Sequence, residues 1–205
     1  MAVGPYALTT LATVKLQLEI AGTNYDTLLE RYIDSVTARF ETMTDRLLKQ
    51  RTITEYQDGR NNASTLLDQW PAEKPTEFWV DSTGLFTDSD RQLAVADYEL
   101  ELSGRGEGVG VTLINKCRIG RGRRNVKIVY LGGYATIPAD LEDAAIWAVE
   151  FMYDMRSDRR IGTESKGKNQ ETTRFLENFP SFITDVTDKY RRTEFPTGNL
   201  AIEAR

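Results

Sequence analysis

The first fifty residues carry apolar side chains at spacings of three and four. Thr9 or Thr10 is placed to cap a short helix that stops at Gly22, and Asn24 or Asp26 opens a longer one. The longer segment has one apolar stripe, made of Leu28, Tyr32, Val36, Phe40, Met43 and Leu47. Such a stripe predicts an amphipathic helix with one face toward a core.

Between residues 51 and 133 the helical period disappears, and short alternating or β-branched runs replace it. The predicted strands are 52–56, 77–80, 93–102, 109–119 and 125–131. In the third run, Tyr98, Leu100 and Leu102 alternate with acidic residues, which predicts a sheet covered on one side only. The glycine-containing residues 120–122 favour a hairpin between the last two strands.

A turn and a long apolar helix follow the last predicted strand. Gly132 and Gly133 end the strand, and Pro138 precedes the helix. Glycine adopts positive φ without steric penalty, and proline suits a first helical turn, so these three residues predict a structural turn. The helix, predicted over 141–156, is apolar on several sides. We expect one side to pack on the chain's own core and another to meet a neighbouring subunit. The candidate interface residues are Trp147, Phe151 and Tyr153.

The remaining segments are a charged loop, a short helix and a tail. Residues 157–172 have no periodicity and predict a loop, and a final helix begins near Pro180. Residues 193–205 contain proline and glycine, which disfavour helix, yet they also contain apolar residues that a solvated tail does not need. These residues are Phe195, Leu200 and Ile202. The tail is either disordered or orders on a partner.

Together these elements predict an α+β fold. We expect a mostly helical bundle of about four helices, with an antiparallel β region inserted between the second and third long helices. The predicted division is N-terminal helices of the helical core (1–50), the inserted β region (51–133), C-terminal helices completing the core (134–192) and an extended tail (193–205).

Composition excludes several classes of function. The chain has 205 residues, a formal net charge of -5 and no histidine, which excludes histidine-based acid–base chemistry, Ser-His-Asp and Cys-His nucleophiles and histidine-ligated zinc. The single cysteine, Cys117, excludes an internal disulfide. With no secretion signal and no apolar run long enough to span a bilayer, we expect an intracellular protein without membrane contact.

No catalytic, cofactor-binding or metal-ligating set is predicted. Residues 162–169 nearly match a phosphate-binding loop, but Asn169 replaces the required Ser or Thr and the segment follows a helix, where a strand is needed. The acidic residues match neither a calcium loop nor a two-metal site. One basic cluster stands out, namely Arg118, Arg121, Arg123 and Arg124, with Lys127 nearby. This cluster is either a group of solvated surface charges or a contact site for acidic protein or passing DNA.

Three stretches resemble the head–tail connector proteins of tailed bacteriophages, also called adaptor or head-completion proteins. They are LTTLATVKLQLEI (8–20), TEYQDGRN (54–61) and VKIVYLGGYATIPADLEDAAIWAVEFMYDMR (126–156). In that family a strand ends in an aromatic-glycine-tyrosine turn, and a proline and an acidic residue open an inner helix that ends near an arginine. The matching positions are Tyr130, Gly133, Tyr134, Pro138, Asp140 and Arg156. The resemblance covers residues 8–192, and the long β region departs from the shortest family members.

The resemblance implies a structural virion protein at the head–tail interface, assembled in the host cytoplasm, without enzymatic activity or cofactor. It implies a homo-oligomeric ring, a dodecamer in the virion, that joins the portal protein to a downstream neck or tail-completion protein. The ring would extend the channel for double-stranded DNA, which passes without sequence-specific contact, and the basic cluster would face the channel or a partner. The C-terminal tail would dock on the portal through Phe195, Leu200 and Ile202.

Two alternatives stay open on the residues alone. A small intracellular nucleic-acid-binding protein would use the basic hairpin at 118–127, and its DNA affinity would fall steeply with salt. An enzyme would have to work with carboxylates or an oxygen-ligated metal, for which no motif is present.

Overall fold

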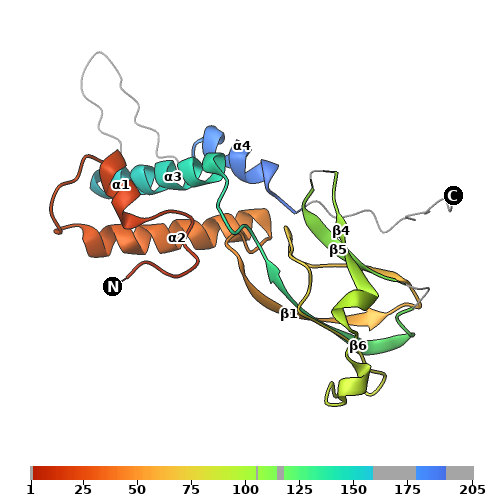
Figure 1. Ribbon diagram of the computed structural model, residues 1–205. Coiled ribbons are helices and arrows are strands. Elements are labelled where there is room, and N and C mark those ends of the chain that lie inside the picture. The colour runs from red at the N-terminus through yellow and green to blue at the C-terminus, as the bar shows by residue number, and fades with distance from the viewer. Residues whose placement is uncertain (1, 105, 115–117, 159–178, 193–205) are drawn as a thin grey trace, which may run out of the picture.

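A computed structural model describes residues 2–104, 106–114, 118–158 and 179–192. The helices within these ranges are α1 (Leu11–Gln17), α2 (Asp26–Thr44), α3 (Ala139–Asp158) and α4 (Ser181–Lys189). The strands are β1 (Arg51–Gly59), β2 (Ser64–Leu66), β3 (Glu77–Val80), β4 (Tyr98–Leu102), β5 (Gly108–Leu113) and β6 (Gly122–Gly132). Two 3-10 turns, η1 (Ser89–Arg91) and η2 (Val95–Asp97), precede β4. Figure 1 shows the helices at one end of the molecule and the strands at the other.

Local signals set the ends of the first two helices. The hydroxyl of Thr10 accepts a hydrogen bond from the Thr13 N–H at 3.2 Å, which satisfies one free donor at the start of α1. Helix α2 ends at Asp45, which takes the left-handed conformation with φ 51°. Its buried face includes Leu29 and Ile33 as well as three residues of the predicted stripe, namely Tyr32, Val36 and Phe40. The other stripe residues, Leu28, Met43 and Leu47, are only partly buried, and Leu47 lies beyond the end of the helix.

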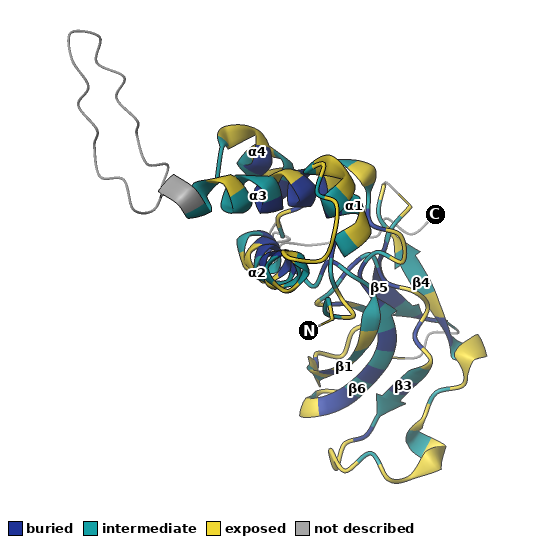
Figure 2. Ribbon diagram, turned by 90° about the vertical axis from the view of Figure 1, so that its left-hand side faces the viewer, coloured by how far each residue is buried: buried dark blue, intermediate teal, exposed yellow. Residues whose placement is uncertain are grey.

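The four helices, which we call the helical half, share one apolar core. Its main members come from α2 and α3, with contributions from the N-terminal segment and α4. They include Leu8, Val14, Leu29, Ile33, Val36, Phe40, Leu48, Leu141, Ala145, Val149 and Ile183. Figure 2 shows the buried residues on the facing sides of α2 and α3, with exposed residues on their outer sides.

The strands form two three-stranded antiparallel sheets, which we call the sheet half. Strand β6 is central in the order β1-β6-β3, and β5 is central in the order β2-β5-β4. Alternate residues of β6 point inward, so Val126, Ile128 and Tyr130 are all buried. These side chains join a second apolar core that consists of Leu67, Ala72, Phe78, Tyr98, Val111, Leu113, Ile119, Val126, Ile128 and Tyr130.

The prediction of a mostly helical bundle is wrong. The described chain has two antiparallel sheets with a core of their own, so it is a mixed α+β fold that is rich in strands. The predicted strands 52–56 and 125–131 are shorter than β1 and β6, which span nine and eleven residues. Strand β2 was not predicted. Long paired strands bury enough apolar surface to form a body of their own beside the helices.

The predicted hairpin between the last two strands is also wrong. Strand β5 pairs with β2 and β4, whereas β6 pairs with β1 and β3, so the two consecutive strands lie in different sheets. The side chain of Asn125 donates to the Gly120 carbonyl at 2.9 Å and accepts from the Gly59 N–H at 2.7 Å. These bonds hold the start of β6 against the end of β1, where a hairpin would have placed β5.

Candidate interaction surfaces

Helix α3 is buried on several sides but not on all. It packs against α1, α2 and α4, and its residues Leu141, Ala144, Ala145, Ala148 and Val149 are at most 4% exposed. Small alanines allow these helices to approach closely. The outer side of α3 remains uncovered by the described chain, and Figure 2 shows exposed residues along it.

An exposed aromatic pair lies at the seam between α3 and α4. The ring centroids of Trp147 and Phe182 are 4.8 Å apart in an edge-to-face arrangement. The two residues remain 47% and 44% exposed. Two large, half-exposed aromatic side chains in contact form a patch of the kind found at protein interfaces. Phe182 falls within the final helix predicted from the sequence, but periodicity does not show which outward residues of two helices meet.

The other two candidate interface residues are engaged within the chain. Phe151 is half-buried and its ring lies 6.2 Å from that of Phe179. Tyr153 is half-buried against Tyr25, with the guanidinium of Arg156 at 3.4 Å from the centre of its ring. The structure therefore brings Trp147 to the surface and places Phe151 and Tyr153 in intramolecular contacts.

The turn into α3 is closely packed. Gly133 has φ 101°, and its N–H donates to the Pro71 carbonyl at 2.8 Å. A Cβ atom here would lie 2.9 Å from the carbonyl group of Lys49. Gly132 is equally confined, since a Cβ atom would meet the side chain of Ile53 at 2.6 Å. The Pro138 carbonyl accepts from the N–H groups of Leu141 and Glu142 in the first turn of α3, so the turn leads straight into the helix.

The N-terminus of α3 is tied to the end of α4 through Asp140. Its carboxylate accepts hydrogen bonds from Lys189, Tyr190 and the Leu141 N–H. The bonds from Lys189 and then Tyr190 lower the pKa of Asp140, despite some desolvation. A carboxylate is also favourable near a helix N-terminus because it faces the positive end of the dipole.

Arg46 joins the two halves. It is 5% exposed, and its guanidinium donates to the carbonyls of Tyr190, at 3.0 Å, and Trp70. The same group stacks 4.5 Å from the centre of the Trp70 ring, and Tyr134 lies on it as well. Its Nε is buried without a hydrogen-bond partner. One buried cation thus connects the end of α4 with the segment that precedes β3.

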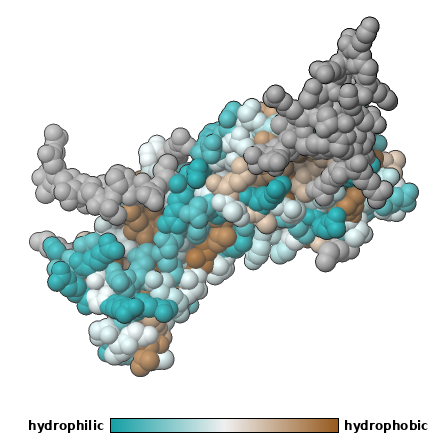
Figure 3. All heavy atoms as spheres, turned by 180° about the vertical axis from the view of Figure 1, so that it is seen from behind, coloured by the Kyte–Doolittle hydropathy of each residue, from teal (hydrophilic) through white to brown (hydrophobic). Residues whose placement is uncertain are grey.

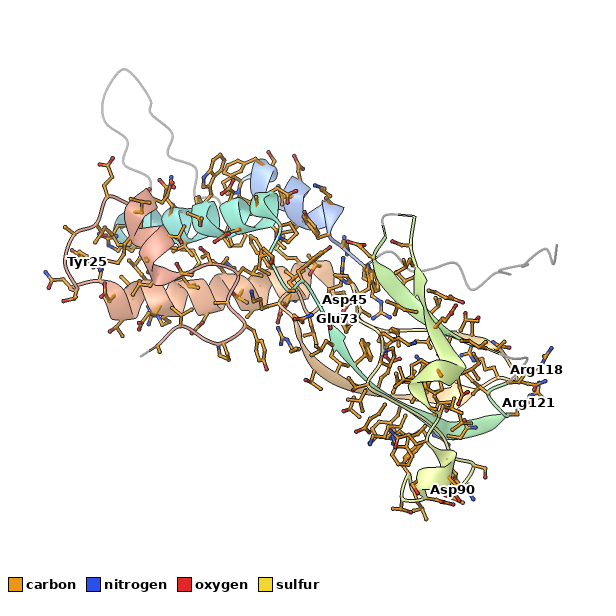
Figure 4. All side chains as sticks on the ribbon, in the orientation of Figure 1. Tyr25, Asp45, Glu73, Asp90, Arg118 and Arg121 are labelled. Atoms are coloured by element: carbon orange, nitrogen blue, oxygen red, sulfur yellow. The ribbon has the colours of Figure 1, made fainter. Side chains whose placement is uncertain are left out.

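The predicted basic cluster lies at the end of the sheet half farthest from the helices. Its four members are exposed, and Figure 4 shows Arg118 and Arg121 at that end, directed outward. The guanidinium of Arg124 lies 5.2 Å from the centre of the Tyr56 ring, a partner that sequence reasoning missed. Tyr56 is paired with Lys127 on the adjacent strand, and the contact lies beside an irregularity in the pairing of β1 and β6, where Arg124 takes the left-handed conformation with φ 46°. Arg123 is also exposed, and a shared surface for the four arginines stays a prediction.

Two buried carboxylates in the sheet half have pKa values that are shifted in opposite directions. Desolvation raises the pKa of Glu55, against hydrogen bonds from Gln57, the Asp68 N–H and Tyr130. Desolvation also acts on Asp81, but bonds from Thr83, the Phe86 N–H and Arg91 outweigh it and lower its pKa to about 2. Both carboxylates are satisfied by the chain itself and act as structural anchors.

The described ranges contain neither a metal-binding cluster nor a membrane-spanning helix. No group of three acidic or cysteine side chains in these ranges is arranged to hold a metal ion. Among the described helices, none combines the length and the apolar character needed to cross a bilayer. The proposed tail residues Phe195, Leu200 and Ile202, the near-match to a phosphate loop and Cys117 lie outside the described residues.

The solved structures that share this fold include three from GTA particles. One is described as the neck of an empty GTA particle computed with C6 symmetry, with TM-score 0.64 and 15% identity over 97% of this chain and 96% of that one. A second is a virion of a native gene transfer agent (GTA) particle, with TM-score 0.64, 17% identity and the same coverage. A third is the neck of a native GTA particle computed with C12 symmetry, with TM-score 0.60, 16% identity and 97% coverage of both chains. At these identities the likeness shows a common fold.

The sequence itself then identifies the family. It matches the family model described as head completion protein over residues 7–193. Because this span takes in most of the chain, the protein belongs to the head completion protein family, whose members are structural proteins of the virion. The resemblance drawn from the sequence is thereby confirmed. No curated protein sequence matches the chain.

Proposed function

We propose that this head completion protein forms an adaptor ring that joins the portal vertex of a phage head to the neck or tail. The observation that carries the proposal is the exposed aromatic pair on α3 and α4. A helix that is apolar beyond its own core needs a further protein surface to cover it. The necks with which the chain shares its fold were computed with C6 and C12 symmetry, which supports a ring of subunits, a dodecamer in the proposed state.

The proposed portal contact is the C-terminal tail, with Phe195, Leu200 and Ile202 as its apolar anchors. The described chain positions the start of that tail. The Arg192 N–H donates to the Thr44 carbonyl at 2.8 Å, and its guanidinium pairs with Asp68 at 3.1 Å. A fixed starting point raises the effective concentration of each tail at its site, so a ring of weak contacts would bind firmly.

The ring would extend the DNA channel. A net charge of -5 disfavours tight binding of the DNA backbone and so favours passage of the duplex. The exposed arginines at the end of the sheet half support a contact there with passing DNA or with the downstream neck protein. The same arginines keep the nucleic-acid-binding alternative testable, since it requires salt-dependent DNA affinity of the free protein.

The direct test is electron microscopy in negative stain of the protein mixed with its portal. The proposal expects rings seated on the portal, and a mixture without rings would overturn it. A chain that ends at Arg192 keeps the contacts of Arg192 with Thr44 and Asp68 and loses only the tail. In co-sedimentation this shortened chain is expected to lose portal binding. Undiminished binding would show that the tail is not the anchor.

A further inference from the structure

A groove runs between α2 and α4 on the flank of the helical half. It has a volume of about 790 Å³. Ser35, Ala38 and Thr42 form its α2 side, and their spacings of three and four place them on one helix face. Arg39 and Met43 also line this side, and the volume of the groove is large enough to receive large side chains. Thr184 lines the α4 side.

The groove and the exposed aromatic pair lie on opposite flanks of α4. Thr184 faces the groove and Phe182 faces Trp147. Two residues of helix correspond to about 200° of rotation, so these side chains leave α4 in nearly opposite directions. One molecule therefore presents an aromatic projection on one flank and a recess on the other.

The charges of the two surfaces are complementary. Around Trp147, Asp143 and Asp154 lie one and two turns away on the same exposed side of α3, and Asp185 is exposed beside Phe182. In the groove, the guanidinium of Arg39 lies 5.0 Å from the centre of the Phe179 ring. Among the described residues, no acidic side chain lines this groove.

We propose that the occupant of the groove is the Trp147–Phe182 pair of a second copy of this chain. The acidic residues around the pair would then meet Arg39 at the edge of the groove. This contact is heterologous, because two different surfaces meet, and repeated heterologous contacts close into a ring when the rotation permits. The inference rests on the ring of the proposed function and adds the two surfaces that build it.

The test uses two double variants and their mixture. Trp147→Ser/Phe182→Ser removes the pair and leaves the groove, while Ala38→Glu/Arg39→Glu places acid in the groove and leaves the pair. All four positions are exposed, so the variants are expected to fold, which circular dichroism and thermal melting check. The control Ala96→Glu/Arg60→Glu makes the same charge change on exposed residues of the sheet half.

Self-association is measured by sedimentation velocity up to the highest soluble concentration. We expect the wild type and the control to associate, and each of the other two variants to associate roughly tenfold or more weakly. A mixture of the two variants contains one intact groove and one intact pair, so it is expected to give 1:1 dimers that grow no further.

Three results would overturn the contact: wild-type protein that stays monomeric, variants that associate like the wild type, or a mixture that stays monomeric. The last result would indicate that the pair meets its own copy, or that residues 159–178 of the same chain fill the groove. Microscopy with portal separates this inference from the proposed function. If both variants still form rings there, the adaptor ring stands and this contact is wrong. If the wild type forms none, the proposed function itself is wrong.

Discussion

The helical half and the sheet half satisfy their side chains in different ways. In the sheet half, buried polar groups such as Glu55, Asp81 and Asn125 are hydrogen-bonded within the chain. In the helical half the buried polar side chains are Arg46 and four neutral threonines, Thr9, Thr37, Thr44 and Thr187. Apolar side chains reach the surface in both halves (Figure 3), but among the described ring pairs Trp147–Phe182 is the one in which both rings are exposed. A polar network holds one body in shape by itself, whereas an exposed aromatic pair needs a partner. We therefore propose that the helical half carries the contact between subunits.

The largest expected loss of stability comes from a substitution on the core side of α3, and a substitution on its exposed side gives the comparison. Leu141→Ala empties a fully buried position of α3 and is expected to lower the free energy of unfolding by about 2–5 kcal/mol. Trp147→Ser, on the exposed side of the same helix, is expected to cost the isolated chain only about 1–2 kcal/mol while it weakens self-association. Denaturant unfolding and sedimentation of both variants measure the two effects. Equal losses of stability would contradict the division of α3 into a core side and a contact side.

The contacts of Arg46 connect the helical half with the sheet half, and a substitution of Arg46 removes them. Arg46→Met leaves the carbonyls of Tyr190 and Trp70 without their buried donor and is expected to cost about 2–4 kcal/mol. Arg191→Met, with a side chain 66% exposed in the wild type, is the matched control and is expected to change little. Thermal unfolding followed by near-ultraviolet circular dichroism measures both. If Arg46→Met is as stable as the control, the two halves are held together by other contacts.

The turn between the halves tests backbone geometry. Gly133→Val forces a β-branched residue to positive φ and brings its Cβ within 2.9 Å of the Lys49 carbonyl group, so we expect a loss of about 2 kcal/mol or more and a lower soluble yield. Gly120→Ala adds a Cβ where no atom lies within 4 Å and serves as the control. Normal yield and stability of the valine variant would show that α3 does not depend on this turn.

The smallest expected effect is a pair of pH dependences inside the sheet half. The pKa of Asp81 is lowered from 3.8 to about 2, so its stabilising contribution is present above pH 3.8 and is lost as the pH falls toward 2. The pKa of Glu55 is raised above 4.5, so its contribution is present below pH 4.5 and is lost as the pH rises through the higher value. The stability difference between wild type and Asp81→Asn is therefore expected to grow with pH, and that for Glu55→Gln to shrink. Unfolding curves across this range measure both, and slopes of the same sign would contradict the assignment.

Periodicity predicted the helices well and the sheets poorly, for a physical reason. The stripe of α2 and the apolar helix α3 are local patterns, and so are the capping residue Thr10 and the glycines before α3. Strand pairing is not local. The register that brings Tyr56 opposite Lys127 and separates β5 from β6 depends on contacts between distant segments. For this reason the two sheets and the contact of Arg124 with Tyr56 could not be read from the sequence.

The candidate interaction surfaces also depend on contacts between distant segments, which local sequence patterns reveal only in part. The excess apolar character of α3 pointed to Trp147, because a single helix reveals how many of its sides are apolar. It did not separate Trp147 from Phe151 and Tyr153, since only the packing of α4 and the N-terminal segment decides which of the three stays exposed. Phe182 and the α2/α4 groove depend on how two distant helices meet, and no local pattern records that.

The most direct test of the central claim is a cryo-electron microscopy map of the ring assembled on its portal. If the helical half makes the subunit contacts, neighbouring copies will meet through α2, α3 and α4, and Trp147 and Phe182 will be covered by the next subunit. If neighbours instead meet only through the sheets, with Trp147 and Phe182 facing solvent, the helical half is not the contact surface and the account is wrong.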